Sequence, residues 1–271
     1  MLINPLDKDA LREQFRSAKP FPHLVVENFL EPTFLKEVVE AYPTFDSAWK
    51  EAKGTRDAFN ALNEKLKVQV SDSSRFPGPV KRLHDAITSK AFLEDLSEIT
   101  GIENLQADPA MRGGGMHLTG PSGRLDVHID FNYSDELKMH RRLNILIYLN
   151  EGWDPAWGGA VELWDTEVKN CEVSVSPLIN RCVLFETSDI SYHGVEPVTC
   201  PPGVGRISFA GYYYTEDAPV QWDGQHHSTV FKARPDEALR DLVLGNFDRL
   251  GRAAYKKLQR GRRLVNMLRG R

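Results

Sequence analysis

Residues 125–131 read Leu-Asp-Val-His-Ile-Asp-Phe, an alternation of apolar and polar side chains that predicts a half-buried β-strand. Because side chains on a strand project alternately to its two faces, His128 and Asp130 are expected on the same face. An imidazole and a carboxylate held side by side on a rigid strand form two ligands for a metal ion. Such triplets also occur by chance as buried hydrogen-bonded pairs, so the prediction depends on the rest of the pattern.

A third ligand is expected from His193, which opens a later predicted strand in Ser-Tyr-His-Gly-Val, residues 191–195. Two imidazoles and one carboxylate can bind three adjacent positions of an Fe(II) octahedron and leave the other positions open. A structural zinc site would instead be a closed tetrahedron. The alternative interpretation is that His193 merely ends a strand.

Arg206 is the only Lys or Arg between Cys182 and Phe231, and Ser208 lies two residues further along the same predicted strand face. A cation on an apolar strand needs a partner if it points inward. The carboxylate of an organic co-substrate would provide one, bound by the guanidinium and the serine hydroxyl. The alternative is an outward-facing arginine paired with a surface acid.

Hydrophobic patterning divides the chain into three regions. Residues 1–105 are expected to be a mostly helical support region, with helices starting at Glu31 and covering 80–100, a short strand within 21–30 and a partly irregular connector over 50–79. Residues 106–216 contain short strands between turn residues, which is typical of a sandwich or closed jelly roll. Residues 217–271 are expected to form a C-terminal helical extension. The expected strands cover 125–131, 143–150, 160–165, 171–176, 181–187, 193–198 and 206–214.

The net charge of −4 hides an uneven distribution. Residues 249–271 contain nine Lys and Arg and no acid, so the rest of the chain has 34 − 9 = 25 basic and 38 acidic residues, a net charge of −13. This basic C-terminal helix is expected either to contact an acidic partner, RNA or a lipid surface, or to pack on the acidic body as a capping helix.

The compartment is predicted from the cysteines and from the apolar segments. The three cysteines form no CxxC pair, which favours a reducing environment over a disulfide framework. No apolar segment reads as a signal peptide, and no apolar run is long enough to span a bilayer. A cytoplasmic protein without a membrane span is therefore expected.

The order His128-x-Asp130, His193, Arg206-x-Ser208 on a strand-rich segment resembles that of the 2-oxoglutarate- and Fe(II)-dependent oxygenases, and within them the prolyl 4-hydroxylase-like branch. The resemblance covers roughly residues 20–216 and is strongest from 124 onward. Supporting phrases are Pro-Phe-Pro-His at 20–23, Leu-Ile-Tyr-Leu-Asn at 146–150 and Trp-Gly-Gly-Ala-Val-Glu-Leu at 157–163.

The resemblance implies an α+β protein with a double-stranded β-helix core, jelly-roll or cupin-like, flanked by N-terminal helices and a C-terminal helix. It implies iron ligation by the two histidines and Asp130. It also implies that Arg206, helped by Ser208, anchors the distal carboxylate of 2-oxoglutarate. No catalytic side chain beyond the metal centre is expected. The cofactors would be Fe(II), 2-oxoglutarate and O2, with ascorbate as an additional candidate.

The implied activity is hydroxylation of an unactivated C–H in an amino-acid-like or peptidyl, including prolyl, substrate, with release of succinate and CO2. Halogenating relatives have a small residue where this chain has Asp130, so the carboxylate favours hydroxylation. Collagen-type members have Lys where this chain has Arg206, which argues against a collagen-like substrate. Two alternatives stay open: a tailoring hydroxylase of a small metabolite or natural product, and a non-catalytic metal-binding jelly-roll protein.

Three side chains are candidate substrate contacts. Asn132 and Tyr133 follow the metal pair in a loop, and loops at the mouths of barrels commonly bind substrates, although a solvated connector explains them equally well. Trp164 is a candidate for a substrate wall, with ordinary core packing as the favoured alternative.

The segment before residue 119 and the later histidine pair carry weaker predictions. Gly113–Gly115 is expected to be a flexible lead into the barrel. Met116 and Leu118 are expected to line the pocket, with His117 alternating to the exposed side. His226 and His227 lie beyond the barrel and are not expected to be ligands.

Overall fold

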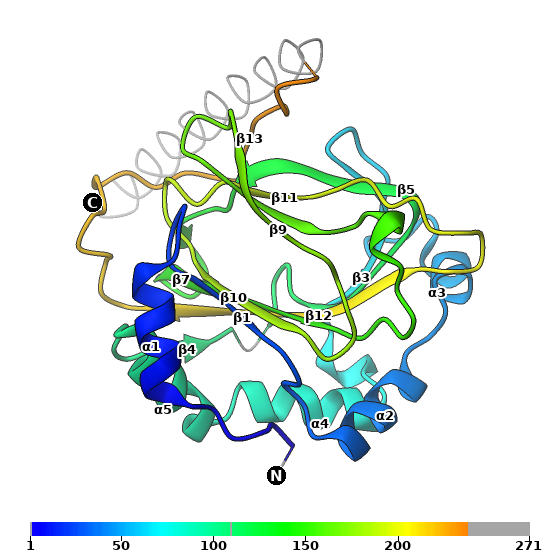
Figure 1. Ribbon diagram of the computed structural model, residues 1–271, viewed down its shortest axis with the longest axis horizontal. Helices are drawn as coiled ribbons and strands as arrows, with labels where there is room; N and C mark the ends of the chain where they lie inside the picture. The colour runs from blue at the N-terminus through cyan, green and yellow to red at the C-terminus, as the bar shows by residue number, and fades with distance from the viewer. Residues whose placement is uncertain (1, 109, 238–271) are drawn as a thin grey trace, which may run out of the picture.

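A computed structural model describes residues 2–108 and 110–237, within which thirteen strands form one antiparallel sheet curled into an open barrel (Figure 1). The main path runs through β1 (His23–Val26), β10 (Cys182–Glu186), β7 (Met139–Tyr148), β12 (Arg206–Thr215), β5 (Gly115–Ile129), β11 (His193–Val195), β8 (Val161–Trp164) and β9 (Cys171–Val175). Five shorter or peripheral strands pair with this path: β2 (Ala58–Phe59), β3 (Glu64–Val70), β4 (Gln106–Ala107), β6 (Tyr133–Ser134) and β13 (Val230–Phe231).

The long strand β5 belongs to both halves of the barrel. Its first part, up to Thr119, pairs with β12, and its last part, from Leu125, pairs with β11 and β13, while β3 runs beside both parts, from Met116 to Leu125. Gly120 lies between these parts, where a Cβ atom would be only 2.2 Å from the Phe45 ring. Glycine is therefore required where helix α3 (Phe45–Ala52) packs on the strand.

Four helices cover the outer face of the sheet formed by β7, β10 and β12 (Figure 1). They are α1 (Lys8–Ser17), α2 (Pro32–Ala41), α4 (Gly78–Ile87) and α5 (Lys90–Thr100); the 3-10 turns η1 (Ser73–Arg75) and η2 (Pro155–Trp157) complete the helical elements. Ile87 of α4 and Phe34 of α2 join Ile145 and Phe209 in one buried apolar cluster. Burial of this face leaves the other side of the same strands to line the interior of the barrel.

The N-terminal region differs from its expected form in two ways. The periodic stretch 80–100 divides into α4 and α5, because Ser89 caps the second helix through Phe92 N; Gly101 ends that helix in the left-handed conformation. The expected connector over 50–79 contains strand β3, whose Lys67 and Val68 pair with β5. The connector is irregular only in part, as expected, but the sequence did not predict this strand, and the N-terminal region contributes strands to the barrel sheet itself.

Each of the seven expected strands has a counterpart, with ends that differ by a few residues, except that β5 begins at Gly115 instead of Leu125. Residues 217–237 contain no helix, so the expected helical extension does not start in this part of the chain. Its strand β13 pairs with β5 opposite His128 and Ile129. The remainder of that extension, including the basic stretch 249–271, lies outside the described residues. Over 2–108 and 110–237, no helix has the length and apolar character needed to cross a bilayer.

Candidate metal centre

Pairing of β5 with β11 places His193 directly opposite His128, and Asp130 follows at the end of β5. One ligand atom from each of the three residues lies within 4.8 Å of the others. His128 Nε2 is 3.7 Å from Asp130 Oδ1, and His193 Nε2 is 3.5 Å from Asp130 Oδ2. The sequence prediction that these side chains converge is therefore matched by the geometry.

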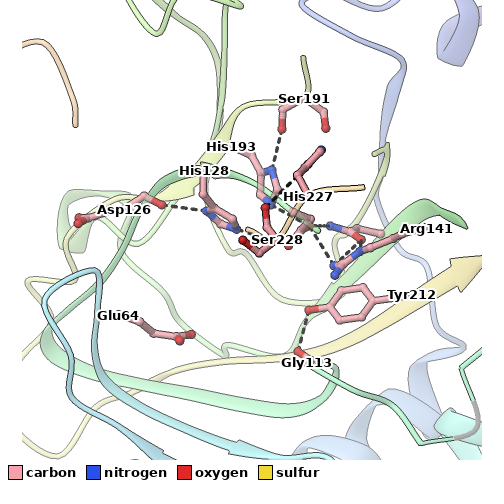
Figure 2. Close-up of polar contacts among 12 residues, drawn as sticks. Glu64, Gly113, Asp126, His128, Arg141, Ser191, His193, Tyr212, His227 and Ser228 are labelled. Atoms are coloured by element: carbon pink, nitrogen blue, oxygen red, sulfur yellow. Dashed lines mark hydrogen bonds and ion pairs between the residues drawn. The ribbon is translucent and has the colours of Figure 1, made fainter. Parts of the chain in front are cut away.

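Backbone carbonyls orient both imidazoles (Figure 2). Nδ1 of His128 is 2.9 Å from the carbonyl oxygen of Asp126, and Nδ1 of His193 is 2.9 Å from that of Ser191. Because a carbonyl oxygen only accepts, each Nδ1 carries the proton. The lone pair of each Nε2 is thus left facing Asp130, which is the arrangement that second-shell partners impose on metal-binding histidines.

The protonation states also suit a metal site. Burial, with a smaller contribution from His128, lowers the pKa of His193 to about 3, so this imidazole is neutral at neutral pH. Burial by itself would raise the pKa of Asp130, but Arg141 and the two histidines outweigh it and hold the pKa well below its usual range. Two imidazoles and one carboxylate form a donor set that fits Fe(II) with open coordination positions.

Arg141 and Asn144, both on β7, lie behind Asp130 and were not found from the sequence. Arg141 Nη2 is 2.9 Å from Asp130 Oδ2, and Asn144 donates a hydrogen bond of 2.8 Å to the same oxygen. The two residues also bond to each other, and the Arg141 side chain is only 2 % exposed. A buried guanidinium is unusual for an arginine unless it is paired, and here its partner is the carboxylate of the cluster.

The register of β12 brings Arg206 and Ser208 to a pocket beside the metal cluster. Ser208 stands opposite His117 of β5 on one side and Tyr148 of β7 on the other. Arg206 is buried and donates to the Gly159 carbonyl (2.6 Å) and to the Tyr148 hydroxyl (3.2 Å). The pocket is lined by Lys67, His117, Thr119, Arg124, Leu125, His128, Asp130, Asn144, Leu146, Val161, Phe185, His193, Val195, Arg206, Ser208 and Tyr212.

Two buried groups in this pocket lack a suitable protein partner. Among residues 2–108 and 110–237, the Ser208 Oγ atom has no hydrogen-bond partner, and Arg206 forms no ion pair with an acid. Burial lowers the pKa of Arg206, which is the sign of an uncompensated buried cation. A carboxylate placed here would satisfy both groups.

The expectations for the start of β5 are wrong. Met116 and Leu118 pack into the apolar clusters under the helices, whereas His117 is buried and lines the pocket. The pocket wall is polar at this point because it faces Arg206, so the apolar residues occupy the opposite face. Gly115 is not a flexible lead either, because a Cβ there would lie 2.1 Å from the Val70 carbonyl of the neighbouring strand β3.

The candidate substrate residues lie apart from the pocket lining. Asn132 accepts from His227 N at 3.0 Å and donates to the Gln225 carbonyl, so it ties its loop to the C-terminal segment. The Tyr133 ring stacks on His226 with ring centres 3.9 Å apart. Trp164 is buried in a small cluster with Val127 and Val168, as its packing alternative predicts. Among the described residues, the metal cluster consists of His128, Asp130 and His193 and does not include His226 or His227.

Comparison with known proteins gives a family for this architecture. Residues 114–214 match the family described as the 2OG-Fe(II) oxygenase superfamily. A mouse protein named prolyl 3-hydroxylase OGFOD1 is 26% identical over 215 residues, which cover 72% of this chain and 33% of the mouse protein. The prolyl 3,4-dihydroxylase OGFOD1 of Ostreococcus tauri is 23% identical over 229 residues, 78% of this chain and 41% of that protein. The chain thus spans between a third and about two fifths of the length of these curated relatives.

Solved structures show the same fold at low identity. A Pseudomonas putida prolyl-4-hydroxylase superposes with a TM-score of 0.51 at 17% identity and covers 75% of this chain and 98% of its own. A Trichoplax adhaerens prolyl hydroxylase, in complex with a hypoxia inducible factor peptide fragment, gives 0.54 at 18% identity, with 77% and 89% covered. These likenesses confirm the double-stranded β-helix. Residues 114–214, which contain the cluster of two histidines and one aspartate, thus match the 2OG-Fe(II) oxygenase superfamily, and the chain is similar to proteins named as prolyl hydroxylases.

Proposed function

We propose that this protein hydroxylates a prolyl residue in a peptide or protein, using Fe(II), 2-oxoglutarate and O2. The observation that carries the proposal is the pairing of a three-ligand cluster with a buried, uncompensated arginine in one pocket. The prolyl and peptidyl part is supported by the two curated relatives, which are named for prolyl hydroxylation and match over 72% and 78% of this chain.

In this proposal His128 and His193 bind Fe(II) through Nε2, and Asp130 binds it through its carboxylate. The bound iron would supply the oxidising chemistry that inserts one atom of O2 into a substrate C–H bond. The second oxygen atom enters 2-oxoglutarate, which loses CO2 and becomes succinate, so atoms and electrons balance. The protein's part is to hold the two imidazoles and the carboxylate in place, exclude water and orient the two organic molecules.

The distal carboxylate of 2-oxoglutarate would bind at Arg206. The guanidinium already donates to two neutral oxygens, on Gly159 and Tyr148, and it lacks an acidic partner within the described part of the chain. Ser208 adds a buried hydroxyl whose oxygen has no partner there. A carboxylate bound here would form charge-assisted hydrogen bonds with the Arg206 guanidinium and the Ser208 hydroxyl. The buried positive charge would then have a counter-charge.

The proposal is tested by incubating the protein with Fe(II), 2-oxoglutarate and a panel of proline-containing peptides under ¹⁸O2. We expect one peptide class to gain a single labelled oxygen on proline, with succinate formed in equal amount and neither product formed by His193→Ala. Fragmentation of the product places the hydroxyl on the ring. Oxygen gained only by free small molecules would support the tailoring alternative, and an absence of succinate with every substrate would refute oxygenase activity.

The compartment and the basic tail add two further proposals. The three cysteines form no disulfide, and Cys182 and Cys200 are buried, which suits a reducing compartment such as the cytoplasm.

Contact of residues 249–271 with an acidic partner, RNA or lipid stays a prediction, because that stretch lies outside the described residues.

A further inference from the structure

A β-bulge in β7 aims Arg141 at the metal cluster. Along the β7–β12 ladder, Leu143 pairs with Tyr213, but the next pair is Arg141 with Tyr214, so the register shifts around Arg142. A bulge adds one residue to a strand and changes the face to which the following side chain points. Under a strict period of two, Arg141 and Asn144 would face opposite sides; with the bulge, both reach Asp130.

The two side chains form a connected unit behind the Asp130 carboxylate. The Arg141 guanidinium donates from Nε and Nη2 to Asn144 Oδ1, at 3.0 and 2.8 Å. These bonds fix the amide so that Asn144 Nδ2 points to Asp130, where it donates to Oδ2 at 2.8 Å. Arg141 Nη2 also pairs with Oδ2 at 2.9 Å. Oδ2 thus has two donors on β7 and also lies 3.5 Å from His193 Nε2, whereas Oδ1 lies 3.7 Å from His128 Nε2.

Arg141 itself has little freedom to move. Its guanidinium carbon lies 3.6 Å from the centre of the Tyr212 ring and 4.8 Å from that of Phe131. Tyr212 is in turn held by a 2.7 Å hydrogen bond from its hydroxyl to the Gly113 carbonyl (Figure 2). A planar guanidinium can stack on an aromatic ring and bond to two acceptors at once, which a lysine ammonium cannot reproduce.

We propose that Arg141 and Asn144 are positioning residues, which hold the Asp130 carboxylate between His128 and His193 and thereby set the affinity of the site for Fe(II). The inference rests on the proposed function, because it takes the cluster of His128, Asp130 and His193 as the iron site. Partners of this kind fix the orientation of a ligand, and their removal weakens metal binding by roughly 10- to 100-fold.

The test is the affinity of the full chain for Mn(II), an air-stable probe of an Fe(II) site, measured by calorimetry. Asn144→Ala removes one donor and keeps the ion pair; we expect a Kd about 10-fold higher. Arg141→Met removes the guanidinium and should raise the Kd by up to about 100-fold, with Arg141→Lys between the wild type and Arg141→Met. The matched control is Arg142→Met, which removes the neighbouring arginine of β7 that bonds Thr215; it should leave the Kd within about twofold.

The melting temperature of each metal-free variant shows whether weaker Mn(II) binding comes from a lost positioning contact or from a protein that is not folded. Arg141→Met leaves Asp130 buried without its cation, so this variant can fail to fold. In that case the Mn(II) affinity of Asn144→Ala alone tests the positioning role. A folded Asn144→Ala with wild-type Mn(II) affinity would overturn the inference and leave the proposed function intact. If the variants bind Mn(II) more weakly than the wild type, but the wild type forms no succinate, the positioning role would be upheld and the proposed function would be refuted. A wild type that does not bind Mn(II) would refute both.

Discussion

Two groups of histidines in this molecule use the same side chain in different ways. The first is the metal cluster of His128, Asp130 and His193. The second, which we call the aromatic cluster, consists of Tyr133, His140, Trp222 and His226. In the aromatic cluster the Tyr133 and His226 rings lie parallel, 3.9 Å apart, and His140 meets Trp222 edge to face at 4.7 Å. These imidazoles act as flat packing surfaces.

The difference comes from the neighbours of each imidazole. In the metal cluster a backbone carbonyl holds each Nδ1, and both Nε2 atoms face one ionised carboxylate. In the aromatic cluster no carboxylate is a member, and the buried His140 Nδ1 has no hydrogen-bond partner among the described residues. A histidine therefore becomes a ligand through a fixed tautomer and a shared carboxylate, and not through burial or proximity to another histidine.

The largest expected effect breaks the metal cluster. His193→Ala should weaken Mn(II) binding by more than about 100-fold, because loss of a ligand costs more than loss of an outer-shell partner. His226→Ala, the matched change in the aromatic cluster, should leave the Mn(II) Kd within about twofold. Calorimetric titration of both variants gives the comparison, and equal effects at the two histidines would show that our division of the clusters is wrong.

The next effect concerns the pocket beside the metal cluster. Arg206→Met should raise the Kd for 2-oxoglutarate by about 30-fold or more, corresponding to ~2 kcal/mol or more for a buried charge pair. Ser208→Ala should raise it by about 10-fold, as expected for a hydrogen bond to a charged group. Neither change should alter Mn(II) affinity in the absence of 2-oxoglutarate. Titration of the Mn(II)-loaded protein with 2-oxoglutarate measures both; an unchanged Kd in Arg206→Met would remove the anchor assignment.

The aromatic cluster should contribute stability only. Tyr133→Ala removes a stacked pair worth about 0.5–1.5 kcal/mol beyond the buried area. The free energy of unfolding in urea should fall by at least this amount, with Mn(II) and 2-oxoglutarate affinities unchanged. A loss of peptide binding in this variant, with both other affinities intact, would instead support the original prediction that Tyr133 contacts the substrate.

The smallest effect is a pH dependence at the edge of the aromatic cluster, where His227 Nε2 is 2.9 Å from Asp189 Oδ1. Burial lowers the pKa of His227, but the bond to Asp189 outweighs it and the net pKa is raised; the pKa of Asp189 is lowered. The pair therefore stabilises the fold below the ordinary histidine pKa, and this contribution is lost as the pH rises through the folded pKa. The melting-temperature difference between wild type and His227→Gln should shrink from about pH 6 to about pH 8. A constant difference would contradict the ion pair.

The sequence was sufficient to predict which side chains share a strand face wherever the period of two held without interruption. His128 and Asp130 on β5, and Arg206 and Ser208 on β12, were predicted on shared faces, and the structure places them so. The alternation of Leu66, Val68 and Val70 with the polar residues Lys67 and Gln69 was a usable signal for β3 that the sequence prediction did not take up. His117 was assigned to the wrong side because Met116 and Leu118 were expected to line the pocket, whereas the structure places His117 in the lining with Thr119 and Arg206.

The positioning unit could not be predicted in the same way. Arg141 faces the metal cluster only because the register shifts opposite Tyr213 and Tyr214, and a bulge depends on the pairing of two strands distant in sequence. The backbone carbonyls that orient the imidazoles carry no side-chain signal at all. The alignment of His193 opposite His128 likewise depends on the β5–β11 register. Sequence patterns thus found the three residues of the metal cluster, and tertiary pairing determined how they are held.

The central claim is that the metal cluster and the Arg206 pocket form one site for Fe(II) and 2-oxoglutarate. The most direct test is anaerobic addition of 2-oxoglutarate to the Fe(II)-loaded protein, with the visible charge-transfer absorption as the readout. We predict a band in the wild type and in His226→Ala, a band only at higher 2-oxoglutarate concentration in Arg206→Met, and none in His193→Ala. A wild type without the band, or a His193→Ala protein that keeps it, would contradict the account.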